Sequence, residues 1–183
     1  MNLTNFFINI SNIGDTKIMF FLTLAISVFL YLINKKIDSL VVAFSAATAI
    51  SITFILKHLF KIPRPENMLV LEDGYRFPSG HATMAAVVAT LVIYFTLKYL
   101  HSDHNKNSDS KNTYKKNINS KSLLISFSKY ILCALAAMWL LTIACARLYL
   151  GVHLLVDVMT GAFIGIVSTI IIIKLAKHLR WFR

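Results

Sequence analysis

Five long apolar stretches, separated by shorter polar segments, dominate the hydrophobic pattern of the chain. They cover residues 18–33, 40–56, 80–100, 123–146 and 152–173. Their lengths are close to the roughly 20 apolar residues that cross the hydrocarbon core of a bilayer, so each predicts a transmembrane helix. Residues 1–17 mix Phe and Ile with Asn, Ser and Thr. This pattern predicts a short amphipathic or re-entrant helix and not a further span.

The last two stretches are almost continuous, and length shows that they must be separate helices. One helix from Tyr130 to Ile173 would be roughly 66 Å long, whereas the hydrocarbon core is about 30 Å thick. The chain must therefore reverse, and Gly151 is the best local breaker. In this run the only charged or imidazole side chains are Arg147, His153 and Asp157. Arg147 then ends one span, and the other two residues begin the next.

These elements predict an all-α fold, a polytopic transmembrane bundle of five spans plus the N-terminal helix, six helices in total. The chain is 57% hydrophobic with a mean hydropathy of +0.66, which excludes an ordinary soluble domain. We expect a single membrane-embedded domain over residues 1–183. Residues 101–122 are rich in Asn, Ser and Lys and predict a flexible cytoplasmic loop. Gly161 and Gly165 form a GxxxG pattern that we interpret as packing within the bundle.

The net charge of the chain, +11, indicates how the spans are oriented in the membrane and not which partner the protein binds. In a soluble protein it would suggest nucleic-acid binding, but here the basic residues flank apolar stretches, so no nucleic-acid partner is expected. With five spans, 13 of the 19 Lys and Arg residues fall on one side of the membrane. The others are Lys17, Lys57, Lys61, Arg64, Arg76 and Arg147. The positive-inside rule then places the richer side in the cytoplasm of a bacterial inner membrane, and residues 57–79 on the periplasmic or outer side.

Three clusters of polar residues fall on this outer side by the span count alone. They are Lys57 with Arg64-Pro65, then Pro78-Ser79-Gly80-His81, and then Arg147 with His153 and Asp157. Ionisable groups at the edge of membrane spans are costly and usually mark function. A structural alternative remains for the third cluster, in which Arg147 and Asp157 form a buried ion pair and His153 is a packing residue.

The chemistry of the three clusters suits a phosphate group. Lys57, Arg64 and Arg147 are cations, and Arg can bind phosphate with two hydrogen bonds. Ser79 and Gly80 open a helix, whose free N–H groups and dipole favour an anion.

Two imidazoles near such an anion can divide the work of phosphoryl transfer. One can attack phosphorus while the other protonates the leaving oxygen. Asp157 is four residues after His153, so on a helix the two would share a face, and the carboxylate can fix the imidazole tautomer. No acid other than Asp157 follows Asp109, so a two-metal carboxylate cluster is missing. Glu66, Glu72 and Asp73 are interpreted as a solvated face of the connecting loop.

The three clusters together resemble the type 2 phosphatidic acid phosphatase superfamily, whose motifs read KxxxxxxRP, PSGH and SRxxxxxHxxxD in that order. The resemblance implies a phosphohistidine intermediate on His153, oriented by Asp157, with His81 as the general acid. It implies that Lys57, Arg64, Ser79, Gly80 and Arg147 hold the phosphate. It implies no metal and no other cofactor.

The chain departs from the family pattern at one motif position. Ala146 stands where the third motif has Ser, which removes a hydroxyl contact worth about 1–3 kcal/mol to a charged group. We expect weaker phosphate binding and not lost catalysis, because the nucleophile, the acid and the cations remain. Membrane members also commonly have six spans, whereas five are counted here.

The resemblance implies a membrane lipid phosphatase whose partners are a lipid phosphate and the bilayer. Undecaprenyl diphosphate is the first candidate substrate, with phosphatidylglycerol phosphate and a lipid A phosphate as close alternatives. A non-enzymatic lipid-phosphate binding or transport protein would be expected to lack His153 or Asp157, and both are present. The vanadate-dependent haloperoxidases share the motifs but are soluble domains, unlike this apolar chain.

Overall fold

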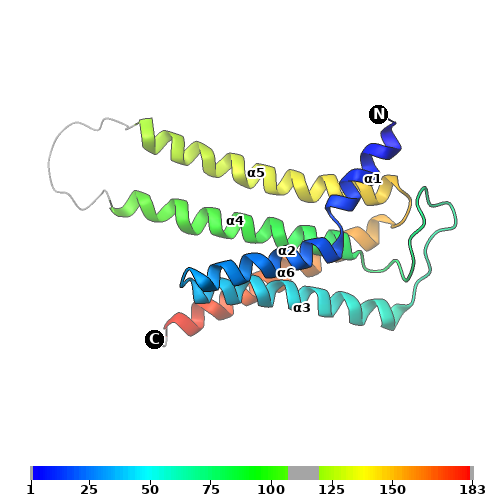
Figure 1. The fold of residues 1–183 in the computed structure, drawn as a ribbon, viewed down its shortest axis with the longest axis horizontal. Coiled ribbons are helices and arrows are strands. Elements are labelled where there is room, and N and C mark those ends of the chain that lie inside the picture. Colours follow the sequence, from blue (N-terminus) through cyan, green and yellow to red (C-terminus); the bar gives the residue numbers. More distant parts are fainter. Residues whose placement is uncertain (1, 107–119, 182–183) are drawn as a thin grey trace.

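The computed structural model describes residues 2–106 and 120–181, with side chains at 2–100 and 127–178, and these residues are helical apart from their connections (Figure 1). The helices are α1 (Leu3–Ile13), α2 (Thr16–Leu32), α3 (Lys36–Phe60), α4 (Gly80–Lys106), α5 (Ser120–Tyr149) and α6 (Leu155–Trp181). Within the described residues, five helical stretches are long and apolar enough to cross a membrane, with α1 and α2 counted as one. The predicted all-α bundle is confirmed.

The break between α1 and α2 occurs at Gly14 and Asp15. The Asp15 carboxylate caps α2, because its Oδ1 accepts the N–H groups of Lys17 at 2.9 Å and Ile18 at 3.2 Å. Helix α1 then leans away from α2 and packs on the end of α5 (Figure 1), where the rings of Phe7 and Tyr149 are 4.4 Å apart. The turn between α1 and α2 therefore lies at the same end of the bundle as the α3–α4 and α5–α6 connections.

Helix α6 packs closely on α4 through the two glycines of the GxxxG pattern. A Cβ on Gly161 would lie 2.4 Å from the carbonyl oxygen of Ser79, and one on Gly165 would lie 2.3 Å from that of Thr83. Only glycine permits this approach of the two backbones. The predicted packing role is confirmed, and it fixes the beginning of α6 against the beginning of α4.

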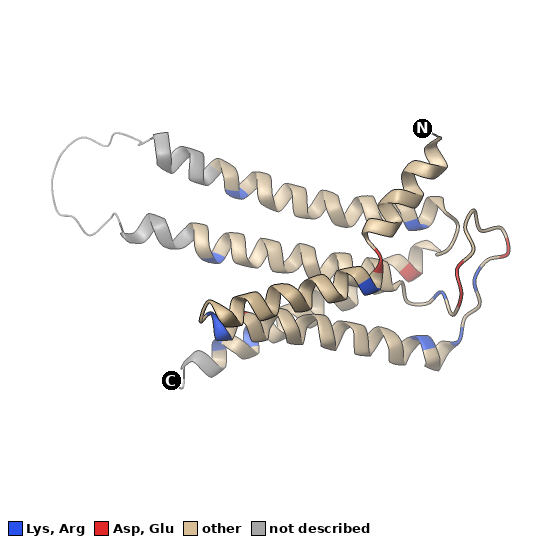
Figure 2. Cartoon of the chain, in the orientation of Figure 1, with Lys and Arg blue, Asp and Glu red and all other residues tan. Residues whose placement is uncertain are grey.

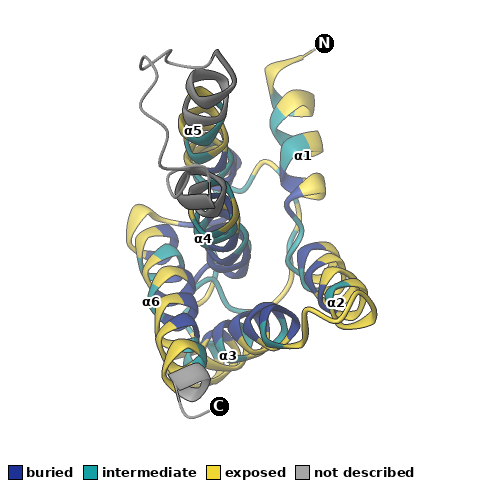
Figure 3. Cartoon of the chain, turned by 90° about the vertical axis from the view of Figure 1, so that its left-hand side faces the viewer, coloured by how far each residue is buried: buried dark blue, intermediate teal, exposed yellow. Residues whose placement is uncertain are grey.

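Residues that face the middle of the bundle are buried, and those on its outside are exposed (Figure 3). The buried cluster comprises Met19, Val41, Val42, Ala46, Ala49, Met84, Val87, Leu91 and Ile173. Large apolar side chains such as Phe29, Leu141 and Phe163 are exposed on the outside, as expected of helices that face lipid. In the part of the chain that the structure describes, Lys and Arg gather towards the ends of the helices and leave the middle free of them (Figure 2).

Helices α4 and α5 extend into the region that the sequence predicts as a loop, residues 101–122. Helix α4 continues to Lys106 and α5 begins at Ser120. The two helices therefore include both ends of the predicted loop, while residues 107–119 lie outside the described range.

Candidate active site

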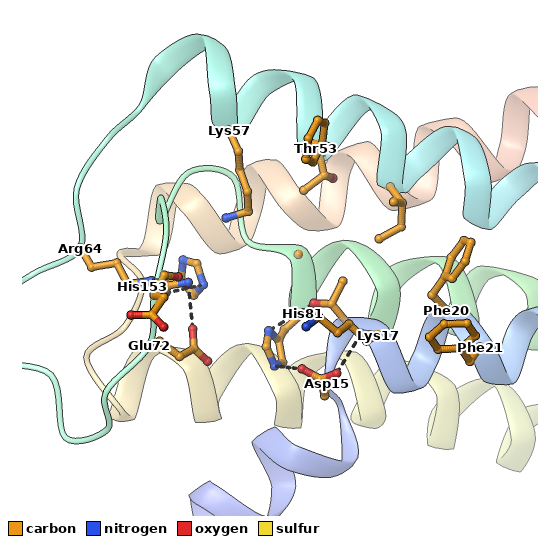
Figure 4. A pocket seen from close by; sticks show the side chains of 15 residues that line it. Asp15, Lys17, Phe20, Phe21, Thr53, Lys57, Arg64, Glu72, His81 and His153 are labelled. Carbon is orange, nitrogen blue, oxygen red and sulfur yellow. Dashed lines mark hydrogen bonds and ion pairs between the residues drawn. The ribbon is translucent and has the colours of Figure 1, made fainter.

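A cavity of about 720 Å³ opens at the end of the bundle that carries the three polar clusters (Figure 4). Its lining residues are Asp15, Thr16, Lys17, Phe20, Phe21, Ile50, Thr53, Phe54, Lys57, Arg64, Glu72, Asp73, Gly80, His81 and His153. Five of the eight sequence-predicted site residues are among them. The other three, Ser79, Arg147 and Asp157, are buried behind this lining.

The turn between α5 and α6 brings the third cluster together. Gly151 has a φ of 69°, which favours glycine, and a Cβ there would lie 3.2 Å from the carbonyl oxygen of Asn67. Arg64 reaches this turn from the α3–α4 connection, where its Nη1 donates to the carbonyl oxygen of Val152 at 3.1 Å. The predicted reversal at Gly151 is confirmed, and the first and third clusters meet there.

Arg147 is fully buried at the end of α5, and its partners come from distant segments. Its Nη2 donates to both oxygens of Glu72 at 2.5 Å, and its Nη1 donates to the Ser11 hydroxyl at 2.5 Å. Arg64 Nη2 lies 2.9 Å from Glu72 Oε2, so this carboxylate joins the two arginines. The interpretation of Glu72 as a solvated loop residue is wrong. Arg147 Nε is buried and has no hydrogen-bond partner among the described residues.

Charge balance in this part of the site favours ionised groups. Burial alone would raise the pKa of Glu72, but the hydrogen bonds and charge of Arg147, followed by the charge of Arg64, hold that pKa below its ordinary value. Burial lowers the pKa of Arg64, while the attraction of Glu72 opposes this effect. The arginines therefore form a cationic site in which a carboxylate occupies the anion position.

His153 lies in the turn before α6 and is 3% exposed. Its Nε2 lies 3.4 Å from Arg64 Nη1. Burial first, and then the charges of Arg147 and Arg64, lower the pKa of His153 to about 2, so the imidazole is neutral at pH 7. A neutral imidazole has a free lone pair and can act as a nucleophile.

The expectation that His153 and Asp157 share a helical face is wrong in detail. Helix α6 begins at Leu155, so His153 precedes it. His153 Nδ1 lies 3.7 Å from Asp157 Oδ2, beyond hydrogen-bond length, and this buried nitrogen has no hydrogen-bond partner among the described residues. The carboxylate is nevertheless the acid that faces this nitrogen.

Asp157 is fully buried and is held by a residue that sequence reasoning did not assign to the site. Arg76 Nη1 donates to its two oxygens at 3.0 and 2.7 Å, and the N–H of Leu154 donates to Oδ2 at 2.7 Å. The hydrogen bond from the Leu154 N–H caps the beginning of α6. The alternative ion pair between Arg147 and Asp157 is not formed, because each has a different partner. A buried carboxylate needs a cation, and that requirement was the one signal in the sequence pointing to Arg76.

Ser79 and Lys57 are fixed by backbone groups. The Ser79 N–H donates to the carbonyl oxygen of Asp157 at 3.0 Å, and its hydroxyl caps α4 by accepting the N–H of Ala82 at 3.4 Å. Lys57 Nζ, at the end of α3, donates to the carbonyl oxygen of Tyr75 at 2.5 Å. The second cluster is thereby tied to the third.

His81 is contacted by the turn between α1 and α2. Its Nδ1 lies 3.4 Å from the Thr16 hydroxyl, and its Nε2 lies 3.7 Å from Asp15 Oδ2 (Figure 4). The sequence pattern assigned this turn to an amphipathic segment and not to the site. Among the described side chains, no group of three or more His, Cys, Asp or Glu residues is arranged to hold a metal ion.

Comparison with known proteins identifies related membrane phosphatases. The family model of the PAP2 superfamily matches residues 38–181. Phosphatidylglycerophosphatase B of Bacillus subtilis (strain 168) is 24% identical over 175 residues, which cover 95% of this chain and 75% of that protein. The matched region contains all three clusters.

Two solved structures have a similar fold. The transmembrane PAP2-type phosphatidylglycerolphosphate phosphatase from Bacillus subtilis gives a TM-score of 0.75 at 24% identity, over 99% of this chain and 80% of that one. LpxE from Aquifex aeolicus gives a TM-score of 0.59 at 24% identity, over 94% of this chain and 86% of that one. The helical arrangement seen here is therefore shared with solved membrane proteins.

Proposed function

Because the chain belongs to the PAP2 superfamily of type 2 phosphatidic acid phosphatases, we propose that this membrane phosphatase removes phosphate from a membrane lipid through a phosphohistidine on His153. One observation carries the proposal: a neutral, buried His153 stands beside Arg64 and the buried Arg147. Two buried nitrogens, Arg147 Nε and His153 Nδ1, have no hydrogen-bond partner among the described residues. A phosphoryl oxygen bound here would give Arg147 Nε its acceptor.

The first step transfers the phosphoryl group to the protein. The lone pair of His153 Nε2 attacks phosphorus while the bond from phosphorus to the lipid oxygen breaks, and His81 gives that oxygen a proton. Asp157 faces Nδ1 at 3.7 Å and stabilises the positive charge that develops on the imidazole. In the second step water attacks phosphorus, His81 takes the proton from the water, and inorganic phosphate leaves His153.

The cations and the beginning of α4 hold the phosphoryl oxygens in both steps. Lys57, Arg64 and Arg147 neutralise the charge that spreads over these oxygens. Ser79 precedes Gly80, the first residue of α4, which lines the cavity. The Ser79 N–H is bonded to Asp157, so the N–H groups of Gly80 and His81 are the ones that can bind a phosphoryl oxygen. Ala146 provides no hydroxyl at the motif position where the family has Ser. The Ser11 hydroxyl does not contact phosphate in this scheme, but it accepts a hydrogen bond from Arg147 and so holds that side chain in place.

The lining of the cavity supports a lipid substrate. Phe20, Phe21, Ile50 and Phe54 form its apolar part, next to the cationic site. Similarity to phosphatidylglycerophosphatase B makes phosphatidylglycerol phosphate the first compound to test. Undecaprenyl diphosphate, favoured by the predicted outward orientation, is the second.

A substrate panel tests the function directly. Purified protein in detergent is given phosphatidylglycerol phosphate, undecaprenyl diphosphate, phosphatidic acid and lipid A, and phosphate release is measured with and without His153→Ala. We expect release from at least one lipid, loss of release in the variant, and an acid-labile phosphorylated intermediate trapped in the unmodified protein. Unchanged turnover in the variant would overturn the assignment of the nucleophile.

The proposed orientation places the site on the outer face of a bacterial inner membrane. The excess of Lys and Arg at the opposite side supports it. Glu66 is exposed on the α3–α4 connection, so Glu66→Cys in a variant lacking Cys133 and Cys145 gives a single accessible thiol. An impermeant reagent should label it in intact spheroplasts. Labelling only after lysis would reverse the orientation.

A further inference from the structure

The two imidazoles of the site each face a carboxylate at the same separation. His153 Nδ1 lies 3.7 Å from Asp157 Oδ2, and His81 Nε2 lies 3.7 Å from Asp15 Oδ2. Asp157 belongs to the third motif, whereas Asp15 precedes residue 38, where the family match begins. We infer that Asp15 is a positioning residue that orients His81 and supports its protonated form for transfer to the leaving oxygen. The inference rests on the proposed function.

The Asp15 carboxylate is held in place although its side chain is 37% exposed. Its Oδ1 accepts the N–H groups of Lys17 and Ile18 at the beginning of α2, which directs Oδ2 toward His81. The turn is also seated on α5, because a Cβ on Gly14 would lie 2.3 Å from Ile143 Cδ1. The second His–Asp pair is therefore built from fixed backbone and not from a mobile surface residue.

The neighbouring residue, Thr16, completes the contact with the ring. Its hydroxyl lies 3.4 Å from His81 Nδ1. The absence of a side chain at Gly80 permits this approach, since a Cβ there would lie 2.9 Å from Thr16 Oγ1. With Nε2 directed at Asp15, Nδ1 is the nitrogen that can give a proton to the leaving oxygen, beside the Thr16 hydroxyl.

The charges around His81 explain why a general acid needs this carboxylate. Arg147, Arg64, Glu72 and Asp15 all lie within electrostatic range of the imidazole. Burial of the ring and the two guanidinium groups disfavour a positive charge on the imidazole, and the carboxylates favour it. Glu72 is engaged by both arginines, whereas Asp15 pairs with no arginine in the described side chains. Asp15 is thus the carboxylate available to His81.

The test separates this role from that of a helix cap. Asp15→Asn keeps an oxygen that caps α2 but removes the charge. The value of kcat/KM is measured for a lipid phosphomonoester, whose alkoxide must be protonated to leave, and for 4-nitrophenyl phosphate, whose phenolate leaves without a proton. We expect the variant to lose about tenfold or more on the lipid, and less than about twofold on the aryl ester.

Two further variants serve as controls. Glu66→Gln removes the same charge from an exposed position on the α3–α4 connection and should change neither value. His81→Asn should show the same selective loss, and adding Asp15→Asn to it should cause no further loss, because both act on one step.

The outcomes divide cleanly. Equal losses on both substrates, or no loss on either, would overturn the inference and leave Asp15 as a cap alone. Additive losses in the double variant would overturn it too. Failure of the proposed function is seen separately, as no phosphate release by the unmodified protein from any lipid of the panel, and it would remove the inference with it.

Discussion

Glu72 occupies the position where the proposed mechanism places the substrate phosphate. Both carboxylate oxygens accept hydrogen bonds from Arg147 Nη2 at 2.5 Å, and Oε2 lies 2.9 Å from Arg64 Nη2. An entering phosphate must take over these contacts, so Glu72 competes with it. Glu72→Gln keeps the size of the side chain and removes the charge, and it should therefore strengthen the binding of anions.

The size of the effect follows from the contacts that are lost. Hydrogen bonds to charged groups contribute about 1.5–3 kcal/mol net. The Glu72 side chain is 27% exposed, so solvent screening places its value toward the lower part of this range. Glu72 bonds to two guanidinium groups, so about 1.5 kcal/mol for each gives about 3 kcal/mol in total. The amide oxygen of Gln retains a neutral hydrogen bond worth about 1 kcal/mol, which leaves about 2 kcal/mol for the carboxylate charge. At about 1.4 kcal/mol per factor of ten, this corresponds to about 30-fold tighter anion binding.

The assay is competitive inhibition of lipid dephosphorylation by orthovanadate or inorganic phosphate. The inhibition constant should fall about 30-fold in Glu72→Gln. Asp73→Asn is the matched control, because Asp73 also lines the cavity but meets Arg64 only through its carbonyl oxygen, at 3.4 Å. A higher inhibition constant in Glu72→Gln would refute the reasoning, since it would mean that Glu72 holds the arginines in place for the substrate.

Three further predictions concern pH, the buried ion pair and helix packing. Burial and neighbouring cations lower the pKa of His153 to about 2, so only the unfolded chain gains a proton as pH falls below about 6.5. Stability should be complete above that pH and decline below it by up to about 1.4 kcal/mol per unit. Thermal unfolding of His153→Gln should lack this component; an unchanged slope would contradict it. Arg76→Met should cost about 3–5 kcal/mol by leaving the buried charge of Asp157 without a cation, and adding Asp157→Asn should recover part of the loss of thermal stability. Gly161→Ala should cost about 1–3 kcal/mol by displacing the carbonyl of Ser79, and it should lower phosphate release in folded protein.

The sequence was sufficient for the helices and for the convergence of the three clusters. Long apolar stretches report membrane spans directly, because the thickness of the bilayer sets their length. Counting spans then placed Lys57, His81 and Arg147 at one end, since each lies next to a helix end. The GxxxG pattern of α6 was also readable, because a close helix contact needs small residues.

The partners of the cationic residues could not be predicted in the same way. Glu72 and Arg76 lie in the irregular α3–α4 connection, where no period relates sequence position to direction in space. Their contacts with Arg147 and Asp157 span more than 70 residues and depend on the path of this connection. The α1–α2 turn was missed for a different reason. The pattern of apolar residues in 1–17 predicts how this segment lies against the membrane, but it does not predict that the side chain of Asp15 points toward His81.

The close contact of α6 with α4 also bears on biosynthesis. Translation makes α4 before α6, and until α6 inserts, the N–H of Ser79 lacks the carbonyl of Asp157 and Arg76 lacks its carboxylate. His153 lies in the turn that directly precedes α6, so it is made just before this helix. A chain that ends before His153 therefore carries Lys57, Arg64 and His81 but lacks the proposed nucleophile and the contacts that close the site. Under the proposed mechanism, such truncated chains in the membrane should release no phosphate.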